Sequence, residues 1–150
     1  IAYSASISAC EKGRRWDYAL VMLREARGSG VAPDTVMYSA LISACSSGQQ
    51  WKLGLELLEE MCRYDIAPNA ITYCTAIVAC EKGQQWRFAL RLLREMLQMR
   101  IAADTAVYNA TISACEKSAR WCHAFGLLRE IPQHGISADR ITYNAAISSC

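Results

Sequence analysis

The sequence predicts an all-α fold, a right-handed α-solenoid (superhelix) of stacked helix-turn-helix hairpins. Three observations predict it. Residues recur at an unbroken step of 35, each period contains two helical apolar patterns, and glycine or proline separates those patterns. A single hairpin cannot bury the apolar stripes of both its helices, so successive hairpins are expected to stack and share one continuous core.

Four residue types mark the period independently and stay in register along the chain. They are Tyr3, Tyr38, Tyr73, Tyr108 and Tyr143; Ile7, Ile42, Ile77, Ile112 and Ile147; Cys10, Cys45, Cys80, Cys115 and Cys150; and Trp16, Trp51, Trp86 and Trp121. We therefore expect one array over residues 1–150, with repeats 1–34, 35–69, 70–104 and 105–139 and a partial repeat 140–150. The pattern is already under way at residue 1 and still running at residue 150, which indicates a fragment of a longer array.

The first helix of each repeat has apolar residues at i, i+3, i+4 and i+7, which places them on one face. In the second repeat they are Tyr38, Leu41, Ile42 and Cys45. A glycine follows this helix, where we expect the left-handed residue that ends a helix. These glycines are Gly13, Gly48 and Gly83. Ser118 replaces glycine in the fourth repeat, so a more strained turn is expected there.

The second helix of each repeat carries its own apolar stripe. In the second repeat the stripe comprises Trp51, Leu55, Leu58 and Cys62, widened by Leu57 and Met61. The helix ends before proline followed by Asp or Asn, as at Pro33 and Pro68, because proline stops a helix and the next side chain can cap the following one. Pro132 lies late in the fourth of these helices, which is therefore expected to end or bend near Glu130.

The charge balance favours a polyanionic partner only weakly, since the net charge is +2. No apolar run is long enough to span a membrane, so no membrane partner is expected, and no signal or transit peptide is visible. No nucleophile–base signature or phosphate-cradling loop occurs, so we predict no enzymatic activity, no cofactor and no small-molecule substrate.

The glutamates of one repeat phase are expected to be solvated or to pair with adjacent arginines. They are Glu25, Glu60, Glu95 and Glu130, and the arginines include Arg24, Arg94 and Arg129.

Eight cysteines raise the question of a metal or disulfide framework. Five of them share one phase on the predicted buried face, no Cys-x-x-Cys spacing occurs, and His123 and His134 add no ligand cluster. We expect no metal site and interpret the cysteines as small buried hydrophobes in a reducing compartment. The Trp and Tyr series are likewise interpreted as core rather than as base-stacking platforms.

Several segments resemble the pentatricopeptide repeat (PPR) family, in its plain 35-residue (P-type) class. The resemblance is carried by Ile71-Thr72-Tyr73, by Glu95-Met96, by Ala32-Pro33-Asp34 and by the run of residues 141–147. It covers the whole chain. Tetratricopeptide repeats, whose period is one residue shorter and whose arrays usually bind peptides, are the alternative, so a peptide-binding or scaffolding protein remains the second hypothesis.

The resemblance implies binding of single-stranded RNA, about one base per repeat, read by two side chains. One follows the first-helix tyrosine and the other closes the repeat. The pairs are Ser4 with Asp34, Ser39 with Asn69, Cys74 with Asp104, and Asn109 with Asp139; Asn144 opens a fifth. By the family's pattern they select G, A, an undefined base and U from the 5′ end. The four closing residues are also good helix N-caps with no RNA required.

The resemblance also assigns residues that hold the bases and the RNA backbone. Aliphatic residues at the start of each first helix would lie between neighbouring bases: Ile1, Val36, Ile71, Ala106 and Ile141. Lysines at the end of the first helix would approach phosphates: Lys12, Lys82 and Lys117. The family further implies a mitochondrial or chloroplast protein of RNA processing, stability or translation. An RNA nuclease would need a catalytic domain outside these residues, and no protein partner is specified.

Overall fold

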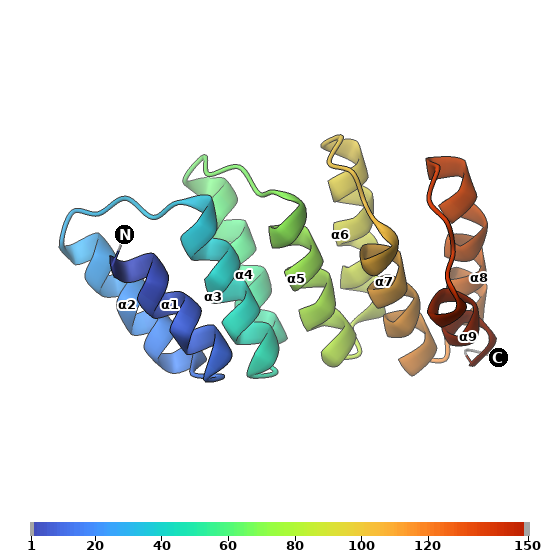
Figure 1. Cartoon of the computed structure of the whole chain (residues 1–150), viewed down its shortest axis with the longest axis horizontal. Coiled ribbons are helices and arrows are strands. Elements are labelled where there is room, and N and C mark those ends of the chain that lie inside the picture. The colour runs from blue at the N-terminus through green and yellow to red at the C-terminus, as the bar shows by residue number, and fades with distance from the viewer. Residues whose placement is uncertain (1, 149–150) are drawn as a thin grey trace. The chain divides into compact units, whose positions relative to one another are not determined.

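The computed structural model describes residues 2–148, which contain nine α-helices, one short 3₁₀-helix and no strand (Figure 1). The helices are α1 (Ala2–Lys12), α2 (Trp16–Gly28), α3 (Thr35–Ser47), α4 (Trp51–Arg63), α5 (Ala70–Lys82), α6 (Trp86–Gln98), α7 (Thr105–Lys117), α8 (Trp121–Glu130), η1 (Ile131–His134) and α9 (Arg140–Ser148). The all-α prediction of consecutive helical hairpins is confirmed. None of these helices is long and apolar enough to cross a membrane.

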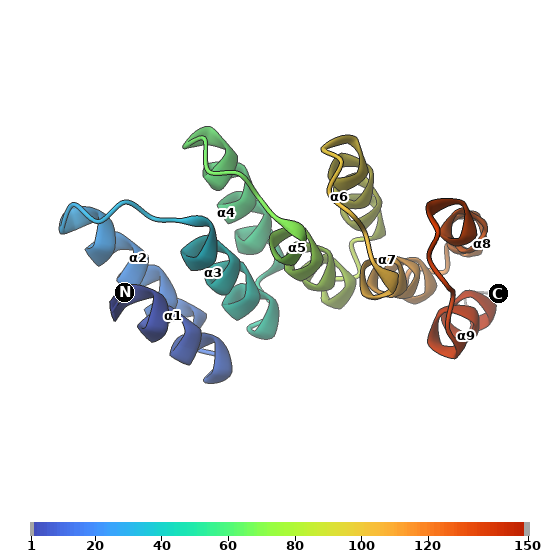
Figure 2. The same cartoon turned by 45° about the horizontal axis from the view of Figure 1, so that its top comes forward.

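The chain divides into two compact units, Ile1–Ala79 and Cys80–Cys150, with the boundary inside α5. In the first unit α1 pairs with α2, α3 lies beside α1, and α4 packs against α3 (Figure 2). In the second unit α7 contacts α6 and α8, and α9 lies beside α7. Within each unit, first helices of consecutive repeats therefore lie next to each other, so that residues 35 apart occupy neighbouring positions.

The predicted apolar face of the first helix forms the core. Tyr38, Leu41, Ile42 and Cys45 are completely buried. The second-helix stripe was predicted less well, because the buried face of α4 runs through Gly54, Leu57, Leu58 and Met61. Cys62, which we assigned to this stripe, is exposed, since it lies one position past the buried Met61 and points off that face.

The prediction for the turn glycines is wrong by one residue. Gly48 has a φ of −86°, whereas the following Gln49 has a φ of 58°. The same left-handed conformation occurs at Arg14, Gln84 and Ala119. In each turn the next backbone N–H bonds back to the carbonyl of the phase-marking cysteine, as in Gln50 to Cys45 at 2.8 Å. Ser118 has an ordinary φ of −103°, so the expected extra strain is absent at that residue.

A close contact with tryptophan accounts for glycine at residue 48. A Cβ atom built there would overlap Cδ1 of Trp16 and lie 3.0 Å from its Nε1. The Trp16 ring therefore packs on the turn of the next repeat, and Trp16, Trp51 and Trp86 are only partly buried, which corrects the expectation that the tryptophans lie in the core. Trp86 lies with its ring centroid 4.8 Å from that of His123, and Trp121 is 53% exposed.

The last hairpin ends as Pro132 predicts. Helix α8 stops at Glu130, and the chain continues as a 3₁₀ turn that terminates at Gly135 with a φ of 70°. The prediction that this helix is shortened is therefore confirmed. The physical reason is the missing N–H of proline and the clash of its ring with the preceding turn.

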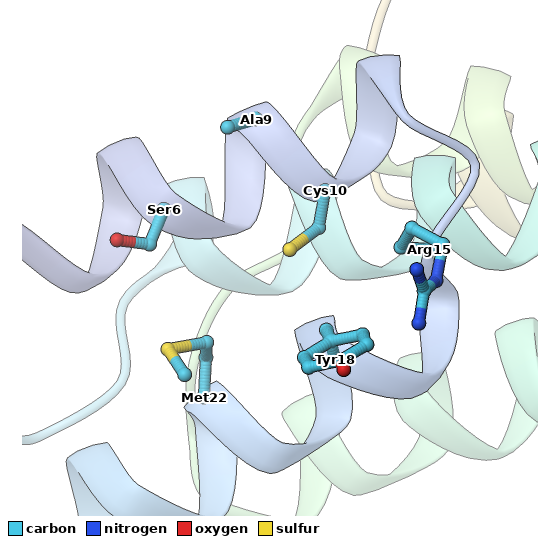
Figure 3. A pocket seen from close by; sticks show the side chains of 6 residues that line it. All are labelled: Ser6, Ala9, Cys10, Arg15, Tyr18 and Met22. Carbon is cyan, nitrogen blue, oxygen red and sulfur yellow. The ribbon is translucent and has the colours of Figure 1, made fainter.

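A shallow hollow lies between α1 and α2, lined by Ser6, Ala9, Cys10, Arg15, Tyr18 and Met22 (Figure 3). Ala9 is exposed here, whereas its counterpart one repeat later, Ala44, is completely buried beside α1. The hollow thus belongs to the stacking face of the hairpin, and none of the base-reading candidates lines it.

Candidate nucleic-acid interface

All four repeat-closing residues act as N-caps, as their chemistry predicts. The side chains of Asp34 and Asp104 accept the backbone N–H three residues ahead at 2.8 and 3.0 Å. Asn69 and Asp139 do the same for Thr72 and Thr142 at 3.0 and 2.8 Å. Capping removes one unsatisfied donor at the start of each first helix. It also holds each closing side chain beside the start of the next repeat.

The second candidate pair is joined into one hydrogen-bonded group. Ser39 is 8% exposed on α3, and its Oγ lies 2.8 Å from Oγ1 of Thr72 on α5. Thr72 Oγ1 in turn donates to Oδ1 of Asn69 at 3.0 Å. Two residues that lie 30 apart in the sequence are therefore brought together through a third that was not predicted.

The fourth candidate pair shows direct contact as well as the same kind of link. Nδ2 of Asn109 donates to both carboxylate oxygens of Asp139 at 3.4 Å. The hydroxyl of Thr142 contacts Oδ1 of Asn109 and lies 2.7 Å from Oδ1 of Asp139. Hydrogen bonds from the Thr142 hydroxyl and backbone amide hold the pKa of the exposed Asp139 carboxyl below its ordinary value.

The remaining predicted readers lie at the same helical positions. Ser4 is half-buried on α1, Cys74 is half-buried on α5, and Asn144 is exposed on α9. Ser4 and its predicted partner Asp34 both lie in the first unit. Cys74 belongs to the first unit and Asp104 to the second, so each is described only within its own unit.

The predicted base-holding side chains are strongly exposed for aliphatic residues. Val36, Ile71 and Ile141 are 61%, 64% and 65% exposed, each near the N-terminus of a first helix. Ala106 is exposed at the corresponding position, and Ile1 lies outside the described residues. Isolated exposed hydrophobes are common on protein surfaces, but here the exposure recurs at one repeat phase.

The predicted phosphate-binding lysines are all exposed, and Lys117 lies against a carboxylate. Lys12 and Lys82 are exposed at the ends of α1 and α5. The ammonium of Lys117, however, lies 2.9 Å from Oε1 of Glu81, which also accepts the hydroxyl of Ser113 at 2.8 Å. Sequence reasoning missed this contact, because Glu81 precedes Lys82 in the sequence and lies 36 residues before Lys117.

Two of the four repeated glutamates, Glu60 and Glu130, pair with an arginine of the preceding repeat rather than with an adjacent one, which corrects the sequence-based expectation for these two. Glu60 pairs with Arg27, and Glu130 forms a two-pronged bond with Arg94 at 2.6 and 2.8 Å. Burial, together with the Glu60 carboxylate, raises the pKa of Tyr38 to about 12. These pairs connect neighbouring hairpins within each unit, so they serve the scaffold.

The phase-marking cysteines behave as buried hydrophobes, as predicted. Cys45, Cys80 and Cys115 are completely buried, and burial raises the pKa of these thiols to about 11, 12 and 11. Cys10 is half-buried, Cys122 is exposed, and Cys150 lies outside the described residues. Within residues 2–148 no group of His, Cys, Asp and Glu has the arrangement of a metal site.

The fold and the repeated N-cap geometry define a helical-hairpin repeat protein with a 35-residue period. Family models match three overlapping stretches: the PPR repeat family at residues 33–82, the PPR repeat at 71–101 and the pentatricopeptide repeat domain at 91–150. The chain belongs to the pentatricopeptide repeat family. No curated protein matches it.

Solved structures with the same fold include PPR proteins bound to RNA. The PPR domain of Arabidopsis thaliana protein-only RNase P 1, solved with tRNA, is 17% identical with a TM-score of 0.86 over 97% of this chain and 77% of that one. PPR10, solved with an 18-nt psaJ RNA element, is 27% identical with a TM-score of 0.84, over 99% of this chain and 22% of PPR10. Arabidopsis nuclear proteinaceous RNase P 2 is 14% identical with a TM-score of 0.87 over 99% and 34%. The chain thus spans about a fifth of PPR10 and a third of RNase P 2.

Proposed function

We propose that this chain binds single-stranded RNA in a sequence-specific manner, with about one base per repeat. The observation that carries the proposal is the grouping of Asn109 with Asp139, and of Ser39 with Asn69, beside exposed aliphatic residues at the helix starts. Paired polar groups can bond the edge of an unstacked base, and an aliphatic side chain on either side can hold its faces. PPR10, whose structure contains an RNA element, supports this assignment.

The proposed reading is G, A, an undefined base and U in repeats one to four. The readers are Ser4/Asp34, Ser39/Asn69, Cys74/Asp104 and Asn109/Asp139, with Asn144 beginning a fifth site. Val36, Ile71, Ala106 and Ile141, and Ile1 by its sequence position, would hold the bases, and Lys12, Lys82 and Lys117 would approach the phosphates. A role in organellar RNA processing, stability or translation remains part of this proposal.

The deciding experiment changes one reader. Asn109→Ser is expected to move the fourth-base preference from U towards G in a binding selection with randomised RNA. Gln133→Ala, an exposed change on η1, is the matched control and should leave the preference unchanged. An Asn109→Ser variant with the wild-type preference would refute the assignment of readers.

A peptide-binding scaffold is the second candidate. It is favoured only by the general similarity of helical-hairpin arrays, whereas variable polar readers with lysines at the helix ends favour RNA. Binding of unstructured peptides with no response to RNA would support it over the RNA proposal.

A further inference from the structure

Two of the proposed reading pairs are joined through a completely buried threonine of the following first helix. Thr72 of α5 links Ser39 to Asn69, and Thr142 of α9 links Asn109 to Asp139. Both threonines are 0% exposed, so their hydroxyls are satisfied only by these protein groups. The equivalent residues in the other repeats are Met37 and Val107, which carry no hydroxyl.

At the second pair, the threonine determines which atoms face outward. A threonine hydroxyl has one proton and two lone pairs. When the proton of Thr72 goes to Asn69 Oδ1 at 3.0 Å, its oxygen can accept the backbone N–H of Asn69 at 3.2 Å and the hydroxyl of Ser39 at 2.8 Å. Ser39 then presents lone pairs, while Asn69, with its Oδ1 occupied, presents its amide protons.

That pattern of one acceptor and one donor is complementary to adenine. The Watson–Crick edge of adenine offers one amino donor and one ring-nitrogen acceptor, whereas that of guanine offers two donors and one acceptor. If the Ser39 proton or the Asn69 amide could turn, the pair would present mixed patterns and discriminate less. With its proton on Asn69 Oδ1, the Thr72 oxygen can only accept, so the Ser39 hydroxyl donates to it, while the Thr72 backbone N–H holds the Asn69 amide oxygen at 3.0 Å.

At the fourth pair the same logic orients an amide. The one proton of Thr142 goes to Oδ1 of Asp139 at 2.7 Å, and the Asp139 carboxylate, which can only accept, draws the Nδ2 group of Asn109 at 3.4 Å. One N–H of Asn109 remains available as an outward donor, and Oδ2 of Asp139 remains an acceptor. A donor beside an acceptor fits uracil, which offers a carbonyl oxygen next to its ring N–H.

We propose that Thr72 and Thr142 are positioning residues for base selection: each supplies, from the following repeat, the hydroxyl that fixes the hydrogen-bonding polarity of the preceding reading pair. Sites one and three, where this position is apolar, would discriminate less sharply. This inference rests on the proposed RNA-binding function and concerns the sharpness of base choice rather than the identity of the readers.

The first test compares wild type with Thr72→Val in the full 150-residue chain. Fluorescence anisotropy measures affinity for short RNAs that carry the G-A-N-U order with the second base varied. We expect Thr72→Val to lower the preference for A by about three- to tenfold while the preference for U at the fourth position is kept. Thr72→Ser, which retains the hydroxyl, should restore the preference for A.

Thr111→Val is the matched control. Thr111 is also completely buried, but its hydroxyl donates to the backbone carbonyl of Val107 at 2.8 Å and contacts no reader. It should leave base preference unchanged. An unchanged preference in Thr72→Val, or an equal loss in Thr111→Val, overturns the inference while leaving the RNA proposal intact.

A second readout needs no RNA and separates the two failures. Thr142→Val removes the hydroxyl that bonds the Asp139 carboxylate, so the Asp139 titration followed by NMR should shift to higher pH. An unchanged titration would show that the hydroxyl does not hold this reader and would overturn the inference. Wild-type protein without any base preference overturns the RNA proposal itself, and the inference with it.

Discussion

The hydroxyl of Tyr38 donates to a carboxylate oxygen of Glu60 at 2.8 Å. Arg27 of the preceding repeat contacts both groups. Tyr108, the equivalent residue two repeats later, is equally buried, yet its hydroxyl has no hydrogen-bond partner among residues 2–148. Glu130, the counterpart of Glu60, bonds Arg94 through both of its oxygens and does not accept the Tyr108 hydroxyl. The tyrosine at this repeat position thus has a hydrogen-bonded hydroxyl in the second repeat and an unbonded hydroxyl in the fourth.

Phenylalanine substitution should therefore have opposite consequences at the two sites. Tyr38→Phe removes a bond to a charged group and is expected to lower the free energy of unfolding by about 1.5–3 kcal/mol. Tyr108→Phe removes only an unsatisfied hydroxyl and should be neutral or stabilising. Urea titration followed by circular dichroism measures both, and equal destabilisation would contradict the account.

Glycine at residue 48 should be needed because the Trp16 ring occupies the place of a side chain there. Gly48→Ala places a Cβ atom against the Trp16 ring and should destabilise the chain by about 1–3 kcal/mol, the usual range for overpacking. Gly13→Ala is the matched control, because the nearest atom to its new Cβ is a backbone oxygen at 3.5 Å. The tryptophan fluorescence of Gly48→Ala should also shift, and an unchanged spectrum and stability would show that Trp16 does not lie there.

The role of Gly48 illustrates what the sequence does and does not predict. The face made by Tyr38, Ile42 and Cys45 follows from local periodicity, because each residue's burial depends on its own helix. Gly48 depends on a tryptophan in another repeat, and Thr72 on two partners that its own helix does not supply. The caps were predictable because Asn69 bonds a residue only three positions ahead. The hydrogen bond between Ser39 and Thr72 was not, because it forms only when the two first helices lie side by side.

Left-handed turns offer a route to stabilisation. Ala119 has a φ of 53°, which disfavours any residue with a Cβ atom. Ala119→Gly should therefore raise the free energy of unfolding by about 0.5–1 kcal/mol despite the larger entropy of glycine in the unfolded chain. Ala114→Gly, inside α7 and completely buried, is the control and should destabilise. A loss of stability in Ala119→Gly would contradict the φ assignment.

Thiol chemistry should report the core. The pKa of the buried Cys45 and Cys115 thiols is raised to about 11, and that of Cys80 to about 12, from an ordinary 9.0. A raised folded-state pKa favours the protonated form. The stability that the folded protein gains from keeping these thiols protonated is fully present below pH 9.0. It is lost as the pH rises through about 11 to 12.

The measurement combines mass spectrometry with alkylation. At pH 8 the exposed Cys122 should react rapidly with iodoacetamide, and the three buried cysteines should react only after addition of urea. Raising the pH from 9 to 11 should lower the urea midpoint, and a Cys80→Ala variant should lose part of that pH dependence. Rapid alkylation of Cys80 in native protein would contradict its placement in the core.

The contact between Glu81 and Lys117 should limit the proposed RNA binding. At 2.9 Å the carboxylate partly neutralises an ammonium that the proposal assigns to a phosphate, and it adds a negative charge beside it. Glu81→Gln keeps the size of the side chain while removing that charge, so RNA affinity should rise severalfold at low salt, with the gain shrinking as salt increases. Glu59→Gln, an exposed change on α4 whose carboxylate lies 3.9 Å from Arg63, is the control for net charge. If both variants gain equally, the effect is general electrostatics, and Lys117 has no special position on the RNA.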